Sequence, residues 1–530
     1  MSPILLSCHV VLVSLTLAST PPRPTAGTPS PSTPSGGPSV RIQFKLSKER
    51  FTAIEDRSLR LTLRNEGTAP VELADPFRNS DATLTYTLTG PEYPQGRSAN
   101  GREVTLRNPD NAVGPEAAPR VRLGAGQALE SVLELHEWLP VTQPGRYRLE
   151  ARLEQPSLTV KSTPVEFDIV ASTPGPASLG CDVAAGYHSS VMATWIQDIE
   201  GRPMLVAGVY ADATDDSEWG VRWRPATILG PVEPGSSDAL APWSNNTQGA
   251  PCVDWVVWRN GASVMALAEP ATTAHPFRID LEAPPEHLVR PPLQTASGAL
   301  FIPVIAAGGR ELRLLRFHST VDATEVTPGR EVGRVRLPAR PVASRATIQP
   351  DTLGDAISVI LVDDTAEGLD LHHVRTRPGG GLTRVASTRL PGLSALPGSE
   401  PGLWIDSAGR LNVALIAASL KHPRRAMLAQ VRYRLDGRLE APPRVKAVAE
   451  LPGPARAAIA RYHPENLRQG ALFWAILLED GRLLSPSTTK QDQAMTPRHP
   501  VALPLELYPA RDTYVLTVDP VLGPAFEHLR

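Results

Sequence analysis

The sequence predicts an all-β protein in two parts, a small β-sandwich followed by a larger array of repeated β-hairpins. Three observations predict this. Short apolar runs alternate with polar residues at period two, which is the pattern of half-buried strands. Proline (55 residues) and glycine (40) are abundant and follow no collagen period, as expected for many short strands joined by tight turns. Finally, turns that carry glycine recur before apolar, β-branched runs in the second part.

Length and charge limit the class of protein. A chain of 530 residues is too long for one hydrophobic core and indicates two or three domains. The net charge of −2 gives no general surplus of cations for nucleic-acid phosphates, so no nucleic-acid partner is expected. Only six of the 53 basic residues are lysine, a bias typical of a GC-rich bacterial genome.

The first 38 residues predict export and tethering. Residues 1–20 contain an apolar run from Ile4 to Leu17 and a candidate cleavage site at Thr16-Leu17-Ala18, the features of an export signal. We therefore expect a periplasmic, cell-surface or extracellular location, with either cleavage of the signal or anchoring. Residues 21–38 are rich in Pro, Ser, Thr and Gly and predict a disordered linker. No later segment reaches the length of about 20 apolar residues that spans a bilayer.

Residues 39–171 predict a β-sandwich. Seven to nine alternating runs occur here, beginning with Val40–Leu46, with turn signals such as Asn65 to Gly67 between them. The turn at Pro144-Gly145 leads into a strand that carries Tyr147, an arrangement similar to a tyrosine corner. In this layout the segment resembles the immunoglobulin-like accessory domains of exported bacterial proteins, which implies a spacer or a binding module.

Residues 175–530 predict a β-propeller of six or seven blades. Six glycine-bearing turns, 37 to 61 residues apart, each precede an apolar run. This is the amount of chain that a four-stranded blade needs, and ring closure removes exposed sheet edges. Stacked sandwich domains are the alternative. The glycines of these turns are Gly201, Gly261, Gly298, Gly354, Gly409 and Gly470.

One of these turns resembles a known hairpin. The segment from Asp406 to Gly409 resembles the Asp-box of sialidase-like propellers in its aspartate and glycine, although Leu411 to Val413 stand where a tryptophan is expected. In that family the box is a folding device away from the active site, so the resemblance implies architecture and no chemistry.

Candidate ligand-binding residues lie in two acidic loops. If the glycine turns join first and second strands, loops between second and third strands share the opposite face, where propellers usually bind ligands. Clustered carboxylates at this face are candidates for Ca²⁺, although the spacing matches no known calcium motif, and solvated hairpin tips are the alternative. The candidates are Asp212, Asp215, Asp216, Glu218 and Trp219 in the first loop, and Asp363, Asp364, Glu367 and Asp370 in the second.

Other residues give weaker signals. Trp219, Trp223 and Trp243 could stack on sugar rings or be core residues. His372 and His373 are adjacent on a predicted strand, so they point to opposite faces and only one can enter a given site; no zinc site is expected. Cys181 and Cys252 form either a disulfide or two free thiols. The motifs of common hydrolases and phosphate-binding loops are absent from the sequence, and no cofactor is expected.

Two functions fit the sequence. The first is an exported, non-enzymatic binding protein whose propeller loops recognise a protein or glycan while the sandwich acts as a spacer. The second is a polysaccharide-acting glycoside hydrolase or lyase with its active site in the propeller. Three arginines and a Tyr/Glu pair converging on the channel would favour the enzyme, and an apolar or scattered channel mouth would favour binding.

Overall fold

The computed structural model describes most of the chain after residue 38. All of the described secondary structure is β-strand, so the predicted all-β class is confirmed. In this part of the chain no helix is long and apolar enough to cross a membrane. The described ranges are 39–74, 83–100, 120–135, 141–155, 158–181, 190–211, 222–223, 226–240, 243–244, 255–268, 275–295, 299–306, 308–319, 326–349, 356–377, 381–434, 436–463, 471–486, 494–503, 505–509 and 513–528.

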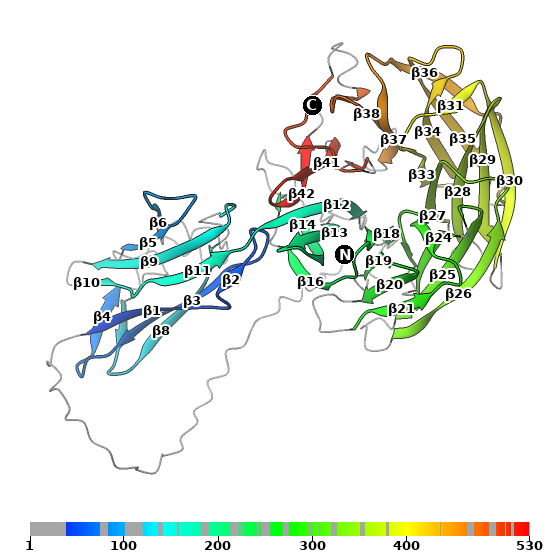
Figure 1. The fold of residues 1–530 in the computed structure, drawn as a ribbon. Helices are drawn as coiled ribbons and strands as arrows, with labels where there is room; N and C mark the ends of the chain where they lie inside the picture. Colours follow the sequence, from blue (N-terminus) through cyan, green and yellow to red (C-terminus); the bar gives the residue numbers. More distant parts are fainter. Residues whose placement is uncertain are drawn as a thin grey trace, which may run out of the picture.

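The N-terminal strands form two main sheets that face each other, as Figure 1 shows. One sheet has the order β1-β3-β8 and the other β2-β11-β9-β5-β6, with β10 beside β9 and a small β4-β7 pair. The pairings are antiparallel except for β2, which lies parallel to β11. The strands are β1 (Val40–Leu46), β2 (Arg50–Phe51), β3 (Ser58–Asn65), β4 (Val71–Ala74), β5 (Thr83–Thr89), β6 (Arg97–Asn100), β7 (Arg120–Leu123), β8 (Ala128–Glu134), β9 (Gly145–Gln155), β10 (Leu158–Lys161) and β11 (Val165–Ile169).

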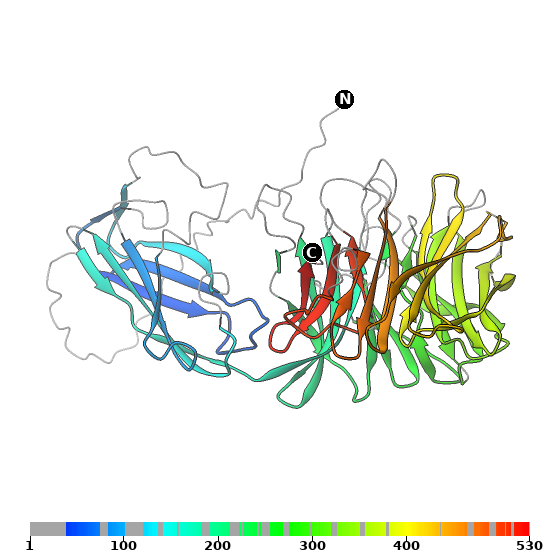
Figure 2. The ribbon, with the colours of Figure 1, turned by 90° about the horizontal axis from the view of Figure 1, so that it is seen from above.

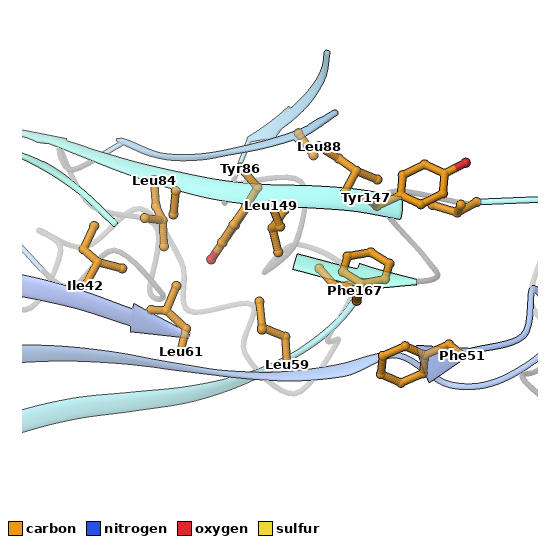
Figure 3. Close-up of a cluster of buried hydrophobic side chains, with 14 of the residues drawn as sticks. Ile42, Phe51, Leu59, Leu61, Leu84, Tyr86, Leu88, Tyr147, Leu149 and Phe167 are labelled. Carbon is orange, nitrogen blue, oxygen red and sulfur yellow. The ribbon is translucent and has the colours of Figure 1, made fainter. Parts of the chain in front are cut away.

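The core between these sheets follows from the period-two pattern. In β3 the side chains of Leu59, Leu61 and Leu63 are fully buried while the residues between them face outward. They meet Leu84 and Tyr86 of β5 from the opposite sheet (Figure 3). Burying a leucine contributes roughly 1.5–3 kcal/mol, so this alternation specifies both the register and the stability of the pair of sheets.

The expected tyrosine corner is present at the start of β9. The Tyr147 hydroxyl donates a hydrogen bond to the carbonyl of Gln143 over 2.9 Å, and its ring stacks on Phe167 with centroids 5.8 Å apart. This hydroxyl-to-backbone bond four residues upstream defines such a corner. It fixes the turn at Gly145, whose φ of 140° suits glycine.

The remaining strands form a ring of sheets. Seven sheets occur in the described residues from β12 onward, and Figure 1 shows them succeeding one another around a central axis. Seen from above, they make a flat disc beside the N-terminal sheets (Figure 2). Their orders are β12-β13-β14-β15 with β16 beside β14, β17-β19-β20-β21, β18-β23-β24-β25-β26 with β22 beside β24, β27-β28-β29-β30, β31-β34-β35-β36 with β33 beside β34, β32-β37-β38-β39, and β40-β41-β42.

Each of the six apolar runs that follow the glycine turns lies in a strand of this ring. Their bounds are β12 (Ser172–Cys181), β13 (Ser190–Ile199), β14 (Arg202–Ala211), β15 (Arg222–Trp223), β16 (Thr227–Pro231), β17 (Ser237–Leu240), β18 (Trp243–Ser244), β19 (Trp255–Asn260), β20 (Ser263–Ala268), β21 (Phe277–Asp280), β22 (Pro285–Leu288), β23 (Leu293–Gln294), β24 (Ala299–Ala306), β25 (Glu311–Ser319), β26 (Val326–Arg336), β27 (Ala343–Gln349), β28 (Ala356–Thr365), β29 (Gly368–Thr376), β30 (Leu382–Pro391), β31 (Leu393–Ala395), β32 (Ser399–Glu400), β33 (Gly402–Ile405), β34 (Leu411–Ser419), β35 (Arg425–Tyr433), β36 (Arg444–Glu450), β37 (Ala455–His463), β38 (Ala471–Leu478), β39 (Leu483–Leu484), β40 (Leu507–Pro509), β41 (Thr513–Asp519) and β42 (Gly523–His528).

The ring is held by apolar clusters that lie between successive sheets. One cluster joins the β19–β20 sheet to the β24–β25 sheet, and the next joins β24–β25 to β27–β28. The series continues to β34–β35, to β37–β38 and to β40–β41. The last sheet returns to the first, because β41 and β42 contact β12. Sheets that pack face to face around a closed ring form a β-propeller, as predicted.

The glycine turns are not equivalent, which corrects the sequence analysis. Gly201 lies between β13 and β14, and Gly261 between β19 and β20, so both turns join second and third strands. Gly409 instead precedes β34 and joins first and second strands of its sheet. Since successive hairpins of a meander lie at opposite ends of the strands, these turns occupy both faces of the ring. A left-handed glycine suits any tight hairpin and does not encode the position of that hairpin in a sheet.

The two parts contact each other directly. The segment after β2 reaches the first propeller sheet, where the Ala226 amide donates to the Ile54 carbonyl over 2.8 Å and Glu55 forms a parallel bridge with Ala226. Ile54 is fully buried, and an exposed ion pair joins Arg50 to Glu200. The chain passes from β11 to β12 through residues 170–171. The junction is therefore held by this short covalent connection and by the hydrogen bond between Ala226 and Ile54.

Candidate functional site

The main candidate site is a pocket between the innermost strands of the ring. Its volume is about 600 Å³, within the range of small-ligand sites. Five sheets contribute to it, because it is lined by the starts or ends of β12, β17, β22, β27 and β32. No single segment of the sequence builds this site; ring closure assembles it.

The pocket wall is largely aliphatic. Ile196, Leu240, Leu288, Val342 and Leu503 line it, together with prolines and small residues. Among the described lining residues there is no Phe, Tyr or Trp. The charged lining residues are Asp198, Asp238, Arg290 and Glu400.

A buried ionic network lies behind one side of this wall. Arg345 of β27 forks between two carboxylates, with Nη1 donating to Glu400 Oε2 over 2.8 Å and Nη2 to Glu506 Oε1 over 3.3 Å. Arg290 approaches the same two carboxylates, at 3.5 Å from Glu400 and 3.7 Å from Glu506. Arg461 of β37, in the same sheet as β32, also bonds Glu506. The network therefore joins residues of β27, β32 and β37 to Arg290, which follows β22, and to Glu506, which precedes β40.

Burial sets the electrostatics of this network. The side chains of Arg345 and Glu506 are each only 2% exposed, and that of Glu400 is 15% exposed. Burial raises the pKa of Glu400, while Arg290 and Arg345 oppose this shift. Among the described residues the network holds three guanidinium groups and two carboxylates, all of them largely buried.

A second polar group lies in the same pocket. His287 Nε2 is 3.4 Å from the Ser344 hydroxyl, and burial lowers the pKa of His287, which favours a neutral imidazole. Asp238 pairs with Arg259, with Oδ2 at 3.4 Å from Nε. Asp238 has a φ of 54°, a left-handed conformation that costs energy for a residue other than glycine and is often found at functional sites.

The acidic residues of the β28–β29 hairpin are brought near one another but do not converge on one point. Asp363 is buried and accepts a hydrogen bond from His372 over 3.0 Å, while Asp364 accepts the amide of Ala395. Arg389 binds both Glu367 and Asp370. In the described part of the chain no group of three or more His, Cys, Asp or Glu residues is arranged to hold a metal ion.

The first acidic loop and its neighbours lie outside the described residues. This applies to Asp212, Asp215, Asp216, Glu218 and Trp219, and to Cys252. The loop follows β14, the third strand of its sheet. β14 therefore ends at the face of the ring opposite the β28–β29 hairpin, which joins a second strand to a third. The prediction that both acidic segments join second and third strands is wrong, because the first one follows a third strand.

The two adjacent histidines point to opposite faces of β29, as predicted. His372 bonds Asp363 and Ser387. His373 is fully buried, lies 3.2 Å from the Ser358 hydroxyl and packs against the Tyr433 ring. Both are internal contacts of the fold.

The ionic network was not predicted from the sequence. Its members, Arg290, Arg345, Glu400, Arg461 and Glu506, are spread over more than 200 residues and form no motif. One weak signal exists. Arg345 is the one charged residue of β27, and a buried arginine requires carboxylate partners.

The comparisons with known proteins leave the family open. No protein-family model matches the chain, and no curated protein matches it. Among solved structures it is similar to BBS1N, crystallised in complex with ARL6DN, at 12% identity and a TM-score of 0.34, covering 67% of this chain and 96% of that one. It is also similar to AofleA from Arthrobotrys oligospora, at 10% identity and a TM-score of 0.36, covering 60% and 86%. These scores are too low to support an argument, so the propeller assignment rests on the sheets described above.

Proposed function

We propose that this protein is an exported, non-enzymatic binding protein that recognises its protein or glycan partner at the central pocket of the propeller. The observation that carries the proposal is the pocket itself. It is a concave space of about 600 Å³ that combines an aliphatic wall with a few fixed polar groups, the usual composition of a binding site.

The ion pairs of the arginines favour a binding function over a catalytic one. Three arginines converge beside the channel, but they bond to Glu400 and Glu506, and no tyrosine is found among the described lining residues. Such a network holds the wall in one shape. Preorganised walls reduce the cost of binding, because little side-chain freedom is lost when the ligand enters.

The N-terminal sheets fit the role of an immunoglobulin-like spacer in this proposal. The strand order, in which β2 lies parallel to β11, and the tyrosine corner at Tyr147 support this membership. The direct junction at Ile54 and Ala226 would hold the pocket at a fixed orientation to the spacer. Residues 1–20 as an export signal, residues 21–38 as a tether and a Cys181–Cys252 disulfide belong to the same proposal.

Partner screening with a pocket-blocking variant tests the proposal. Val342 lines the pocket and is 53% exposed, so Val342→Trp fills space at the pocket without disturbing a core. Val445 on β36 is 44% exposed, and Val445→Trp is the matched control. On glycan and surface-protein arrays we expect partners that bind the wild type and the control but not Val342→Trp. If every partner tolerates Val342→Trp, the pocket is not the binding site.

One observation supports the alternative, a polysaccharide-acting hydrolase. Glycosidases use two carboxylic acids, one of them with a raised pKa, and the pocket contains Asp238 and Glu400, the latter with its pKa raised by burial. This function predicts turnover of polysaccharide by the wild type and its loss in Glu400→Gln. Release of reducing ends is the measurement, and no turnover by the wild type would exclude this alternative for the substrates tried.

A further inference from the structure

The outer side of the β1-β3-β8 sheet carries a group of exposed cations. On β1 these are Arg41 and Lys45, and on β3 they are Arg60 and Arg64. All four alternate with core residues of their strands, so they point to the same, solvent side of the sheet. The side chains of Arg41 and Arg60 are 51% and 58% exposed. We call these four residues the cationic face.

The register of the sheet places these cations directly opposite one another. Arg41 pairs with Arg64, and Lys45 pairs with Arg60. Side chains at directly opposite positions have Cβ atoms about 5 Å apart, and like charges there are destabilising. The arrangement therefore lowers the stability of the sheet, and a purely structural role does not explain it.

Acidic residues lie beside the cationic face and not within it. Glu66, in the turn after β3, is 3.3 Å from Arg41, and Glu130 of β8 is 3.9 Å from Arg60. Glu134 lies further along β8. Exposed ion pairs of this kind contribute little free energy, so an anionic partner can replace them at small cost.

The other outer side of the sandwich has a balanced charge. There β9 contributes three arginines and two glutamates, β10 one lysine, and β11 one glutamate and one aspartate, which is four charges of each sign. Arg146 lies opposite Asp168, a stabilising arrangement. Arg152 lies opposite Lys161, but Glu154 on the same strand bonds Arg152. On the described strands of these two sides, cations gather without acids between them only on the cationic face.

The geometry of the cationic face fits an extended, hydroxylated polymer. Its two cross-strand pairs are four residues apart along β1, about 13 Å at the rise of a strand, which a small anion cannot span. Gln43 and Thr62 lie opposite each other between the pairs and offer an amide and a hydroxyl to sugar hydroxyls. Surfaces that enter a lipid bilayer combine cations with several apolar residues, whereas Val132 is the one large apolar side chain exposed on the described part of this sheet.

From these observations we propose that the cationic face binds an acidic polysaccharide. The acidic groups of the polymer would lie between the paired cations and screen their mutual repulsion. This inference goes beyond the central pocket, because it makes the N-terminal sheets a second binding module as well as a spacer.

Affinity electrophoresis of the full chain through gels that contain polygalacturonate or neutral dextran tests this inference. We expect only polygalacturonate to retard the wild type, and less so as salt is added, because ions screen exposed charges. Arg41→Gln combined with Arg64→Gln should weaken binding about tenfold or more. Arg146→Gln combined with Arg148→Gln removes the same charge from the other outer side and should bind like the wild type. Mobility in the dextran gel corrects for the altered charge of each variant.

A melting experiment separates a binding role from a structural one. Arg41→Gln combined with Arg64→Gln relieves a like-charged pair, so it should melt no lower than the wild type. If this variant fails to fold, Lys45→Gln combined with Arg60→Gln alters the other pair and should show the same loss of binding.

Three results would overturn the inference: no retardation of the wild type by polygalacturonate, equal weakening in the variants of both outer sides, or tighter binding to phosphatidylglycerol vesicles, which would indicate a membrane surface. Val342→Trp alters only the central pocket and should bind polygalacturonate like the wild type. A failure of the cationic face therefore leaves the array partners of the pocket unaffected, and a failure of the pocket leaves polygalacturonate binding unaffected.

Discussion

At the scale of single residues, buried polar side chains have specific partners. Their protonation therefore changes the free energy of unfolding. His373 is the clearest case. Burial lowers its pKa to about 4, whereas an unfolded histidine titrates near 6.5. The folded chain therefore binds fewer protons than the unfolded chain between these two pH values.

We predict a pH-dependent loss of stability that arises from this histidine. The contribution of His373 is complete above pH ~6.5 and is lost as the pH falls towards ~4, by about 3 kcal/mol in total. Urea unfolding across this range should show a steeper pH dependence for the wild type than for His373→Gln. His422→Gln alters an exposed histidine and should keep the wild-type slope; equal slopes for all three proteins would contradict the prediction.

At the scale of elements, turn chemistry fixes where strands begin. In the turn before β34 the Asp406 carboxylate accepts the amides of Ala408 at 3.0 Å and Arg410 at 3.1 Å, and also Arg410 Nε at 2.8 Å. Gly409 follows with a φ of 74°. These bonds satisfy the turn backbone locally, which explains why the aspartate and glycine were recognisable in the sequence.

We predict that Asp406→Ala destabilises the protein by about 2 kcal/mol, because several hydrogen bonds to a charged group are lost together. Chemical denaturation measures the change. The control is Asp436→Ala, since Asp436 is exposed and accepts the amide of Arg438; it should cost less than about 1 kcal/mol. Similar costs for both variants would mean that the turn before β34 has no special role.

At the scale of the whole molecule, the ionic network links sheets that are far apart in the sequence. Glu506 is almost completely buried and is the common partner of Arg290, Arg345 and Arg461. Removing its charge leaves one carboxylate, Glu400, to compensate the buried guanidinium groups, and breaking a buried ion pair in this way typically costs about 3–5 kcal/mol.

We therefore expect Glu506→Gln to lower the free energy of unfolding by about 3–5 kcal/mol. Glu450→Gln removes a carboxylate from an exposed pair with Arg425 and should cost below ~1 kcal/mol. Guanidinium denaturation compares the two variants. A small effect of Glu506→Gln would show that apolar clusters alone hold the ring closed.

The junction between the two parts is a second feature of this scale. Ile54 is fully buried beside Ala226, so Ile54→Asp places a charge in an apolar contact. We expect a larger radius of gyration in small-angle scattering and separate melting transitions for the two parts. Val132→Asp, at a site that is 62% exposed, should retain the compact form and serves as the control.

Much of the architecture can be predicted from local sequence patterns. The alternation of Leu59, Leu61 and Leu63 predicts β3, and the apolar run after Gly409 predicts β34, because side-chain period and turn preference act between near neighbours. Several strands were missed for the same reason. The two-residue strands β2 and β39 are too short to show a period, and only their partners in space make them strands.

The sequence by itself determined that this protein is all-β, that strands and hairpins repeat, and where one tyrosine corner lies. Only the tertiary structure decided which turns share a face and which residues meet at the centre. Gly201 and Gly409 lie in similar sequence patterns but on opposite faces of the ring. The sequence of a hairpin does not specify the position of that hairpin in a sheet. Arg290, Arg345 and Glu506 become one network only when the ring closes, since charges distant in the chain interact through space and leave no local pattern.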